Sequence, residues 1–279
     1  MPYTAEISRT NPTCILFLID QSSSMEGPFG GQQGKKKSEG VADAINRVLQ
    51  NLVLKCAKAD GVRDYFHIGV IGYGDTVTPL LKNVSENKVL HPISAVATSP
   101  MRVEQRKRLV DDGAGGFTEQ SYRFPIWFEP VAEGKTAMYG ALELAKQVIG
   151  GFLLRFPKCF PPLIINLTDG QPSDANPMQI ASEIRALSST DGQVLLFNAH
   201  ISEQETVPVS FPSDDNRLPD IYAKVLLRMS SVLPDKLRLA AEEEGFAVNP
   251  NSRGFMFNAD LVALVRFLEI GTRVASHVR

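Results

Sequence analysis

The stretch that decides the fold class runs from Cys14 to Ser24 and reads CILFLIDQSSS. Residues 14–19 are all apolar, a pattern typical of a strand that is buried on both faces of a sheet. Asp20 ends this run, and a glycine-rich loop over 27–34 separates it from a segment of helical periodicity, about Ser38 to Ala57. The order of strand, loop and helix predicts one βα unit of a parallel sheet.

The rest of the chain repeats this alternation. We expect further strands at 65–73, 163–167, 194–199 and 254–258, and helices at 136–149, 177–187, 220–229, 235–244 and 260–268. The segment 76–81 is a candidate antiparallel neighbour of the strand at 65–73. The pattern predicts an α/β fold with a doubly wound, mostly parallel sheet, helices on both faces and one antiparallel edge strand.

The segment 89–134 interrupts this alternation. It is rich in proline and aromatic residues, and a structureless loop of that length is improbable inside a compact domain. We interpret it as an insertion that carries a short helix near 103–110 and a strand near 121–128, with Phe124, Trp127 and Phe128 forming its core. Because no linker composition is visible, we expect one domain over 1–279, with a fold core at about 12–270.

Composition narrows the class of protein further. The 279 residues include 29 Lys and Arg against 31 Asp and Glu, which gives a net charge of -2 and excludes a globally basic nucleic-acid binder. No apolar run approaches the roughly 18 residues of a membrane span, and the first residues lack the apolar core of a secretory signal. The three cysteines are far apart in apolar contexts. We therefore expect buried thiols and a cytoplasmic protein.

Three segments place oxygen-bearing side chains where loops leave the expected sheet. Asp20, Ser22 and Ser24 form a D-x-S-x-S pattern directly after the first strand, and Asp169 follows the strand at 163–167. Thr136 lies just before a helix. In a doubly wound sheet the carboxyl ends of the strands share one edge, and ligands bind there. These five side chains are therefore expected to meet in one site.

In these five residues the chain resembles the von Willebrand factor A-type (vWA) domains, which carry a metal-ion-dependent adhesion site. The resemblance implies that Ser22, Ser24 and Thr136 bind a divalent ion directly, while Asp20 and Asp169 often act through water. More weakly, the chain is similar to bacterial cytoplasmic members of the tellurite-resistance type, found beside protein kinases and phosphatases in stress-response and phage-defence systems. The long loop at 27–37 and the insertion at 89–134 depart from the family pattern, so partner specificity is not implied.

The chemistry of such a site points to binding of a protein partner. Hydroxyl and carboxylate oxygens are hard ligands that select Mg²⁺, Mn²⁺ or Ca²⁺. Neutral ligands offset only part of the ion's charge, so a Glu or Asp carboxylate of a partner is the natural further ligand. We therefore predict a non-enzymatic adaptor or regulatory module. Its candidate partner contacts are Gln21, Ser23, Lys35, Lys36, Lys37, Lys135 and Gly170.

Other interpretations stay open. The same ion could assist hydrolysis of a phosphate ester, although no general base or second metal cluster is recognisable. The chain could also be a regulatory subunit of an ATPase assembly. A glutamate or aspartate of the insertion could serve as an internal metal ligand. The run Lys35–Lys37 fits no phosphate-binding loop, because Phe29 stands where the first glycine is needed. We interpret this run as a solvated loop; nucleic-acid binding is not expected, and no oligomeric state is predicted.

Overall fold

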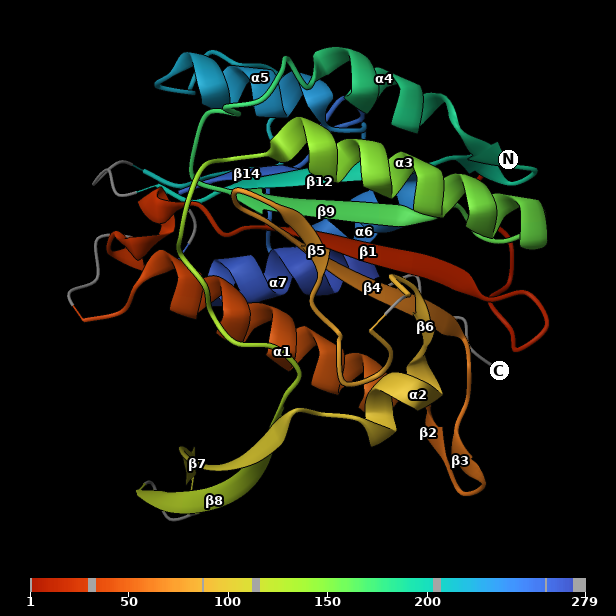
Figure 1. Cartoon of the computed structure of the whole chain (residues 1–279), viewed down its shortest axis with the longest axis vertical. Helices are drawn as coiled ribbons and strands as arrows, with labels where there is room; N and C mark the ends of the chain where they lie inside the picture. The colour runs from red at the N-terminus through yellow and green to blue at the C-terminus, as the bar shows by residue number, and fades with distance from the viewer. Residues whose placement is uncertain are drawn as a thin grey trace.

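A central sheet of eight strands organises the chain (Figure 1). The computed structural model describes residues 2–29, 34–86, 88–111, 116–202, 207–258 and 260–272. Five strands run parallel: β14 (Phe255–Phe257), β12 (Leu195–His200), β9 (Leu163–Thr168), β1 (Thr13–Asp20) and β4 (Phe66–Tyr73), in this spatial order. Antiparallel strands complete the sheet: β5 (Val77–Pro79) and β6 (His91–Pro92) on β4, and β13 (Val209–Ser210) on β14.

Strand β1 occupies the centre of the sheet. It pairs with β4 along its whole length, from Thr13 opposite Phe66 to Asp20 opposite Tyr73, and with β9 on its other edge. The chain passes from β1 to β4 on one side and later to β9 on the other, so the strand order reverses between β1 and β9. The carboxyl ends at this reversal form the crevice where sheets of this class bind ligands.

Helices cover both faces of the sheet (Figure 1). One face packs on α1 (Lys37–Cys56), α6 (Asp235–Glu243) and α7 (Leu261–Thr272), and the other on α3 (Met138–Arg155), α4 (Met178–Ala186) and α5 (Ile221–Met229). Along β1, Ile15 and Phe17 join the first core and Leu16 and Leu18 the second, as the two-residue repeat of a strand requires. Among the described residues, no helix is both long and apolar enough to cross a bilayer.

Short elements connect these layers. They are the 3-10 helix η1 (Ser23–Glu26), the helix α2 (Ile93–Thr98) and two small hairpins, β2 (Ala57–Lys58) with β3 (Gly61–Val62) and β10 (Ser188–Ser189) with β11 (Gly192–Gln193). The predicted α/β class is confirmed, and so is the antiparallel edge at 76–81. The second antiparallel edge, β13, was not predicted. The three cysteines are free and buried, as expected.

The insertion differs from its prediction in several elements: β6 and α2 at its start were not predicted, and the predicted helix is a strand. The segment 103–110, predicted as a helix, belongs to the strand β7 (Arg102–Asp111), which pairs antiparallel with β8 (Phe117–Ile126). The hairpin extends away from α1 at the edge of the molecule (Figure 1). Cross-strand stacking favours the strand: the Arg106 guanidinium lies 3.9 Å from the Phe124 ring centre, and that of Arg108 lies 5.6 Å from Tyr122.

The base of the hairpin is fixed to α1 by one buried side chain. Asn46 accepts a hydrogen bond from the Trp127 backbone N–H at 2.9 Å and donates one to the Phe128 carbonyl at 3.2 Å. The Trp127 indole donates to the Val96 carbonyl at 2.7 Å. Phe124, Trp127 and Phe128 are at most 3 % exposed, which confirms their predicted core role.

Replacing Asn46 by alanine should destabilise the protein. The substitution leaves the Trp127 N–H and the Phe128 carbonyl without their buried partner, at a cost of about 2–4 kcal/mol. Urea unfolding of Asn46→Ala measures this loss. The control is Gln50→Ala, which removes a single hydrogen bond to the Arg123 carbonyl at the surface and should cost less than about 1 kcal/mol. Equal losses in the two variants would contradict the anchoring role of Asn46.

Candidate functional site

The site begins at the end of β1 with a fully buried carboxylate. Asp20 is 0 % exposed, and its two oxygens accept hydrogen bonds from the Ser22 backbone N–H at 2.9 Å and the Thr168 hydroxyl at 2.6 Å. Burial raises the pKa of Asp20 to about 6, against the lowering effect of these hydrogen bonds. Asp20 thus ties the loop after β1 to the end of β9.

A chain of hydrogen bonds continues from this carboxylate to the solvent. The hydroxyls of Ser22 and Ser24 lie 3.0 Å apart, and Ser24 donates to Asp169 Oδ1 at 2.6 Å. Ser22 is buried, whereas Ser24 is exposed on η1. The structure therefore brings four of the five predicted metal-site residues together at the reversal of strand order, and the cluster opens outward at Ser24.

The fifth residue, Thr136, lies in the adjoining loop. Its backbone N–H donates to the Ser173 hydroxyl at 3.0 Å, and its carbonyl accepts from the Ser173 backbone N–H at 2.9 Å. The loop contacts the first one, because Gly134 O accepts from the Ser23 N–H at 3.0 Å. Thr136 does not cap α3, whose N-cap position is Ala137. Asp174 accepts from the first backbone N–H groups of this helix instead.

Gly134 shows how tightly these loops fit. Its φ of +79° is a conformation that favours glycine, and a Cβ there would lie 2.4 Å from the Asp75 carboxyl carbon. The Asp75 carboxylate accepts a hydrogen bond from the Lys135 N–H at 2.9 Å. The third loop is therefore held against the site from both sides, by Asp75 and by Ser173.

The predicted partner contacts divide into exposed and buried residues. Ser23 and Lys135 are exposed beside the cluster, and a Cβ on Gly170 would lie 3.9 Å from the Ser24 hydroxyl, so these three residues form the rim. Gln21 does not reach the surface, because its side chain covers Gly72 of β4 and only 9 % of the residue is exposed. Direct partner contact is therefore wrong for Gln21.

The lysine run is not uniformly solvated, which corrects the expectation for Lys37. Lys36 is exposed and pairs with Glu26. Lys37, the first residue of α1, is buried, and its ammonium contacts Asp169 Oδ2 at 2.5 Å. Both side chains of this pair are at most 4 % exposed, so Lys37 cannot touch a partner directly. Of the loop at 27–37, residues 30–33 lie outside the described part of the chain.

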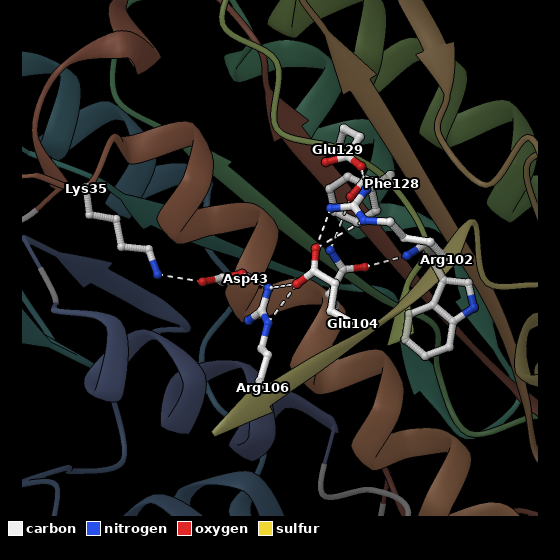
Figure 2. Close-up of polar contacts among 9 residues, drawn as sticks. Lys35, Asp43, Arg102, Glu104, Arg106, Phe128 and Glu129 are labelled. Carbon is white, nitrogen blue, oxygen red and sulfur yellow. Dashed lines mark hydrogen bonds and ion pairs between the residues drawn. The ribbon is translucent and has the colours of Figure 1, made fainter. Parts of the chain in front are cut away.

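Lys35 points toward Asp43 of α1, beside the hairpin (Figure 2). It pairs with Asp43 of α1 at 2.6 Å, and Asp43 also accepts from Arg106 of β7 at 3.0 Å. Figure 2 shows that the pairs continue through Glu104 and Arg102 to Glu129. Apart from Glu104, these charged residues line a pocket of about 380 Å³ between α1 and the hairpin, and Lys35 belongs to this second feature.

Two of the candidate carboxylates of the insertion, Glu119 and Glu129, already have cationic partners. Glu129 pairs with Arg102, and Glu119 pairs with Lys107 across the hairpin at 2.7 Å. Asp112 lies outside the described residues. Glu133 is exposed, and its backbone N–H donates to the Gln21 carbonyl at 2.6 Å, which places it beside the loop after β1. An insertion carboxylate as an internal metal ligand therefore stays a prediction.

A buried polar network lies beneath the site on the α3 side. The Tyr73 hydroxyl donates to Asn166 at 2.7 Å, Asn166 donates to Asn198 at 3.0 Å, and Asn198 donates to the Ser230 hydroxyl at 2.9 Å. Burial and the Asp20 charge raise the pKa of Tyr73 well above its usual value. The network links β4, β9 and β12 under the two loops that carry the carboxylates, which holds their strand ends in register.

The donor set of the cluster fits a hard divalent cation. Ser22, Ser24 and Asp169 present oxygen atoms, the ligand type that Mg²⁺, Mn²⁺ and Ca²⁺ prefer. The hydroxyls of Ser22 and Ser24 form a hydrogen bond with each other, and rotation of the two hydroxyls would direct their oxygen lone pairs to an ion. Asp20 holds the loop in place through the Ser22 backbone N–H. In the described part of the chain, no group of three or more His, Cys, Asp or Glu side chains is arranged for a metal. A metal here would depend on hydroxyl ligands.

Sequence reasoning missed the residues that position the ligands. Thr168 holds Asp20, Ser173 holds the Thr136 loop, and Lys37 holds Asp169. Thr168 and Ser173 flank the Asp169 segment and could have been suspected as hydroxyls near a strand end. Lys37 lies 132 residues from Asp169, and no sequence signal distinguished it from Lys35 and Lys36.

Comparisons with known proteins give distant structural likenesses. No protein-family model matches the sequence, and no curated protein matches it. Similar solved structures include a von Willebrand factor type A protein from Catenulispora acidiphila, with 14% identity over 96% of this chain and 43% of that chain and a TM-score of 0.48. The ArnB paralog VWA2 from Sulfolobus acidocaldarius has 14% identity over 70% of this chain and 36% of that chain, with a TM-score of 0.34.

A third likeness is to proximal thread matrix protein 1 of the mussel byssus, with 13% identity over 96% of this chain and 47% of that chain and a TM-score of 0.46. The present chain spans less than half the length of these three structures. At such identities and TM-scores the likenesses carry no argument about function. The fold class rests on the strands and helices described above.

Replacing Asp20 by asparagine should stabilise the metal-free protein in a pH-dependent way. The folded-state pKa of Asp20, about 6, exceeds its ordinary value of 3.8. Between pH 3.8 and pH 6 the folded protein therefore holds a proton on Asp20 that the unfolded chain has released. Stability due to Asp20 is therefore lost as pH rises through this range. In EDTA we expect Asp20→Asn to be about 1–3 kcal/mol more stable than wild type at pH 7.5, with little difference near pH 4.

Urea unfolding at several pH values measures this difference, and Asp214→Asn, an exposed carboxylate, serves as the control without such a gain. An Asp20→Asn variant that is less stable than wild type at pH 7.5 would show that the buried carboxylate is a net stabilising group.

Proposed function

We propose that this chain is a vWA-type interaction module that binds a divalent cation at the carboxyl edge of its sheet and, through it, a carboxylate of a protein partner. The observation that carries the proposal is the hydrogen-bonded cluster of Asp20, Ser22, Ser24 and Asp169 at the reversal of strand order. Three loops that are far apart in the sequence converge there, and the cluster opens to solvent at Ser24.

Each residue of the cluster has a distinct part in this proposal. Ser22 and Ser24 would hold the ion through their hydroxyls, with Thr136 joining from the adjoining loop. Asp20 and Asp169 would supply negative charge from behind, since their oxygens already accept hydrogen bonds from protein groups. A bound divalent ion, preferably Mg²⁺, would supply positive charge and an open coordination position.

The rim favours a protein ligand over a small molecule. Ser23 and Gly170 lie beside the opening, and Lys135 carries an exposed positive charge next in sequence to Gly134, whose carbonyl accepts from the Ser23 N–H. A Glu or Asp side chain of a partner would meet both the ion and this lysine. The proposed role as a cytoplasmic adaptor in a bacterial stress-response or phage-defence system is supported only by the resemblance of the motif.

The same contacts favour binding over hydrolysis. A general base must take a proton from an attacking water, and the carboxylates of the cluster are the candidates that the motif offers. Both oxygens of Asp20 accept hydrogen bonds inside the protein, and those of Asp169 are engaged by Ser24 and Lys37. Neither carboxylate is placed for this task.

Capture of partners from native cell extract tests the proposal with a matched pair of serine variants. Ser24→Ala removes a hydroxyl of the cluster, whereas the control Ser182→Ala removes an exposed hydroxyl of α4, away from the site. We expect wild type and Ser182→Ala to retain a partner in millimolar Mg²⁺ and to lose it in EDTA. Ser24→Ala should retain at least about tenfold less in Mg²⁺, because a metal ligand is gone.

Circular dichroism and thermal unfolding in EDTA would confirm that both variants are folded. A partner that wild type holds equally in Mg²⁺ and EDTA, and that Ser24→Ala holds as well, would contradict the proposal and place the interface elsewhere, for example on the β7–β8 hairpin.

A further inference from the structure

The Lys37–Asp169 ion pair puts a fixed positive charge inside the proposed metal site. Lys37 begins α1, and its backbone N–H donates to the Gly27 carbonyl at 2.8 Å. Its ammonium contacts Asp169 Oδ2 at 2.5 Å, while Asp169 Oδ1 accepts from Ser24. Lysines are almost never fully buried without a charged partner, so this pair accounts for the burial of both side chains.

The ion pair is difficult to exchange for solvent. The two side chains are 4 % and 1 % exposed, and separating them would leave an uncompensated charge in the interior. Asp169 can therefore keep Lys37 on one oxygen while it acts through Ser24 on the other. The ammonium remains beside the cluster in either state of the site.

The buried Lys37 ammonium changes the net charge of the buried groups at the site. The carboxylates of Asp20 and Asp169 together with the Lys37 ammonium leave one net negative charge when both carboxylates are ionised. A divalent ion changes this to one net positive charge, whereas without Lys37 the loaded site would be neutral. Burial lowers the pKa of His200, which interacts electrostatically with both members of this pair.

We propose that Lys37 makes metal binding and carboxylate binding at this site mutually dependent. This inference rests on the proposed function and adds to it a dependence of metal occupancy on the partner's carboxylate. Lys37 repels the divalent ion when the ion is alone, and an anionic ligand at the opening relieves the excess positive charge. Such coupling is reciprocal, so the ion also strengthens binding of the anion by the same factor. The site then fills with metal chiefly when a carboxylate partner is present.

Binding of Mn²⁺, followed by the electron paramagnetic resonance signal of the free ion, tests this coupling with acetate as the carboxylate probe. Each protein is titrated in chloride and in acetate at equal ionic strength, with protein-free titrations to correct for acetate complexes of Mn²⁺. The variants are Lys37→Gln, Lys37→Arg and, as a control at the far end of the same helix, the exposed Lys55→Gln.

For wild type, Lys37→Arg and Lys55→Gln we expect Mn²⁺ to bind about tenfold more tightly in acetate than in chloride. Lys37→Gln should bind Mn²⁺ about tenfold more tightly than wild type in chloride, because the like charge is gone. Acetate should then raise its affinity by a smaller factor than in wild type, because the bound anion has lost the attraction of the ammonium.

Equal Mn²⁺ affinities of wild type and Lys37→Gln would overturn the inference and leave the proposed function intact. Loss of binding in a folded Lys37→Gln variant would also overturn it, by showing that the lysine merely positions Asp169. Absence of Mn²⁺ binding to every protein would refute the proposed function itself. If Lys37→Gln does not fold, the wild-type comparison decides, since equal affinities in chloride and acetate contradict the coupling.

Discussion

Strand β1 is paired on both edges and covered on both faces, and it ends in a carboxylate that solvent does not reach. A buried charge of this kind needs donors, and they come from the two loops that meet at the reversal of strand order, through the Ser22 N–H and the Thr168 hydroxyl. Asp20 therefore fixes the first loop to the end of β9. The hydroxyl cluster, Asp169 and the buried Lys37 all take their places from this connection.

The hairpin and the site are two separate features joined by α1. Lys37 at the start of this helix reaches Asp169, while Asp43, less than two turns later, holds Lys35 and Arg106 of the hairpin (Figure 2). Asn46 on the same helix anchors the hairpin base. The orientation of the β7–β8 arm relative to the site opening is thus set by one helix.

The sequence predicted the central strands and the convergence of Asp20, Ser22, Ser24 and Asp169 well, because both depend on local patterns. An unbroken apolar run such as 14–19 needs helices on both faces, and carboxylates after two such strands must meet at one edge. The segment 103–110 was misread as a helix. Its stability as a strand comes from stacking of Arg106 and Arg108 on rings of β8, which a local pattern does not show. The ion pair of Lys37 with Asp169 is equally non-local.

Anomalous diffraction from crystals grown with Mn²⁺ and acetate tests directly whether a divalent ion and a carboxylate bind at this cluster. We predict an anomalous peak bonded to the hydroxyl oxygens of Ser22 and Ser24, with an acetate oxygen as a further ligand on its open side. Lys37 should still be paired with Asp169. Mn²⁺ bound elsewhere in the same crystals with no peak at these serines would contradict the proposed metal site. In that case the cluster of Asp20, Ser22, Ser24 and Asp169 would be a structural connection between loops.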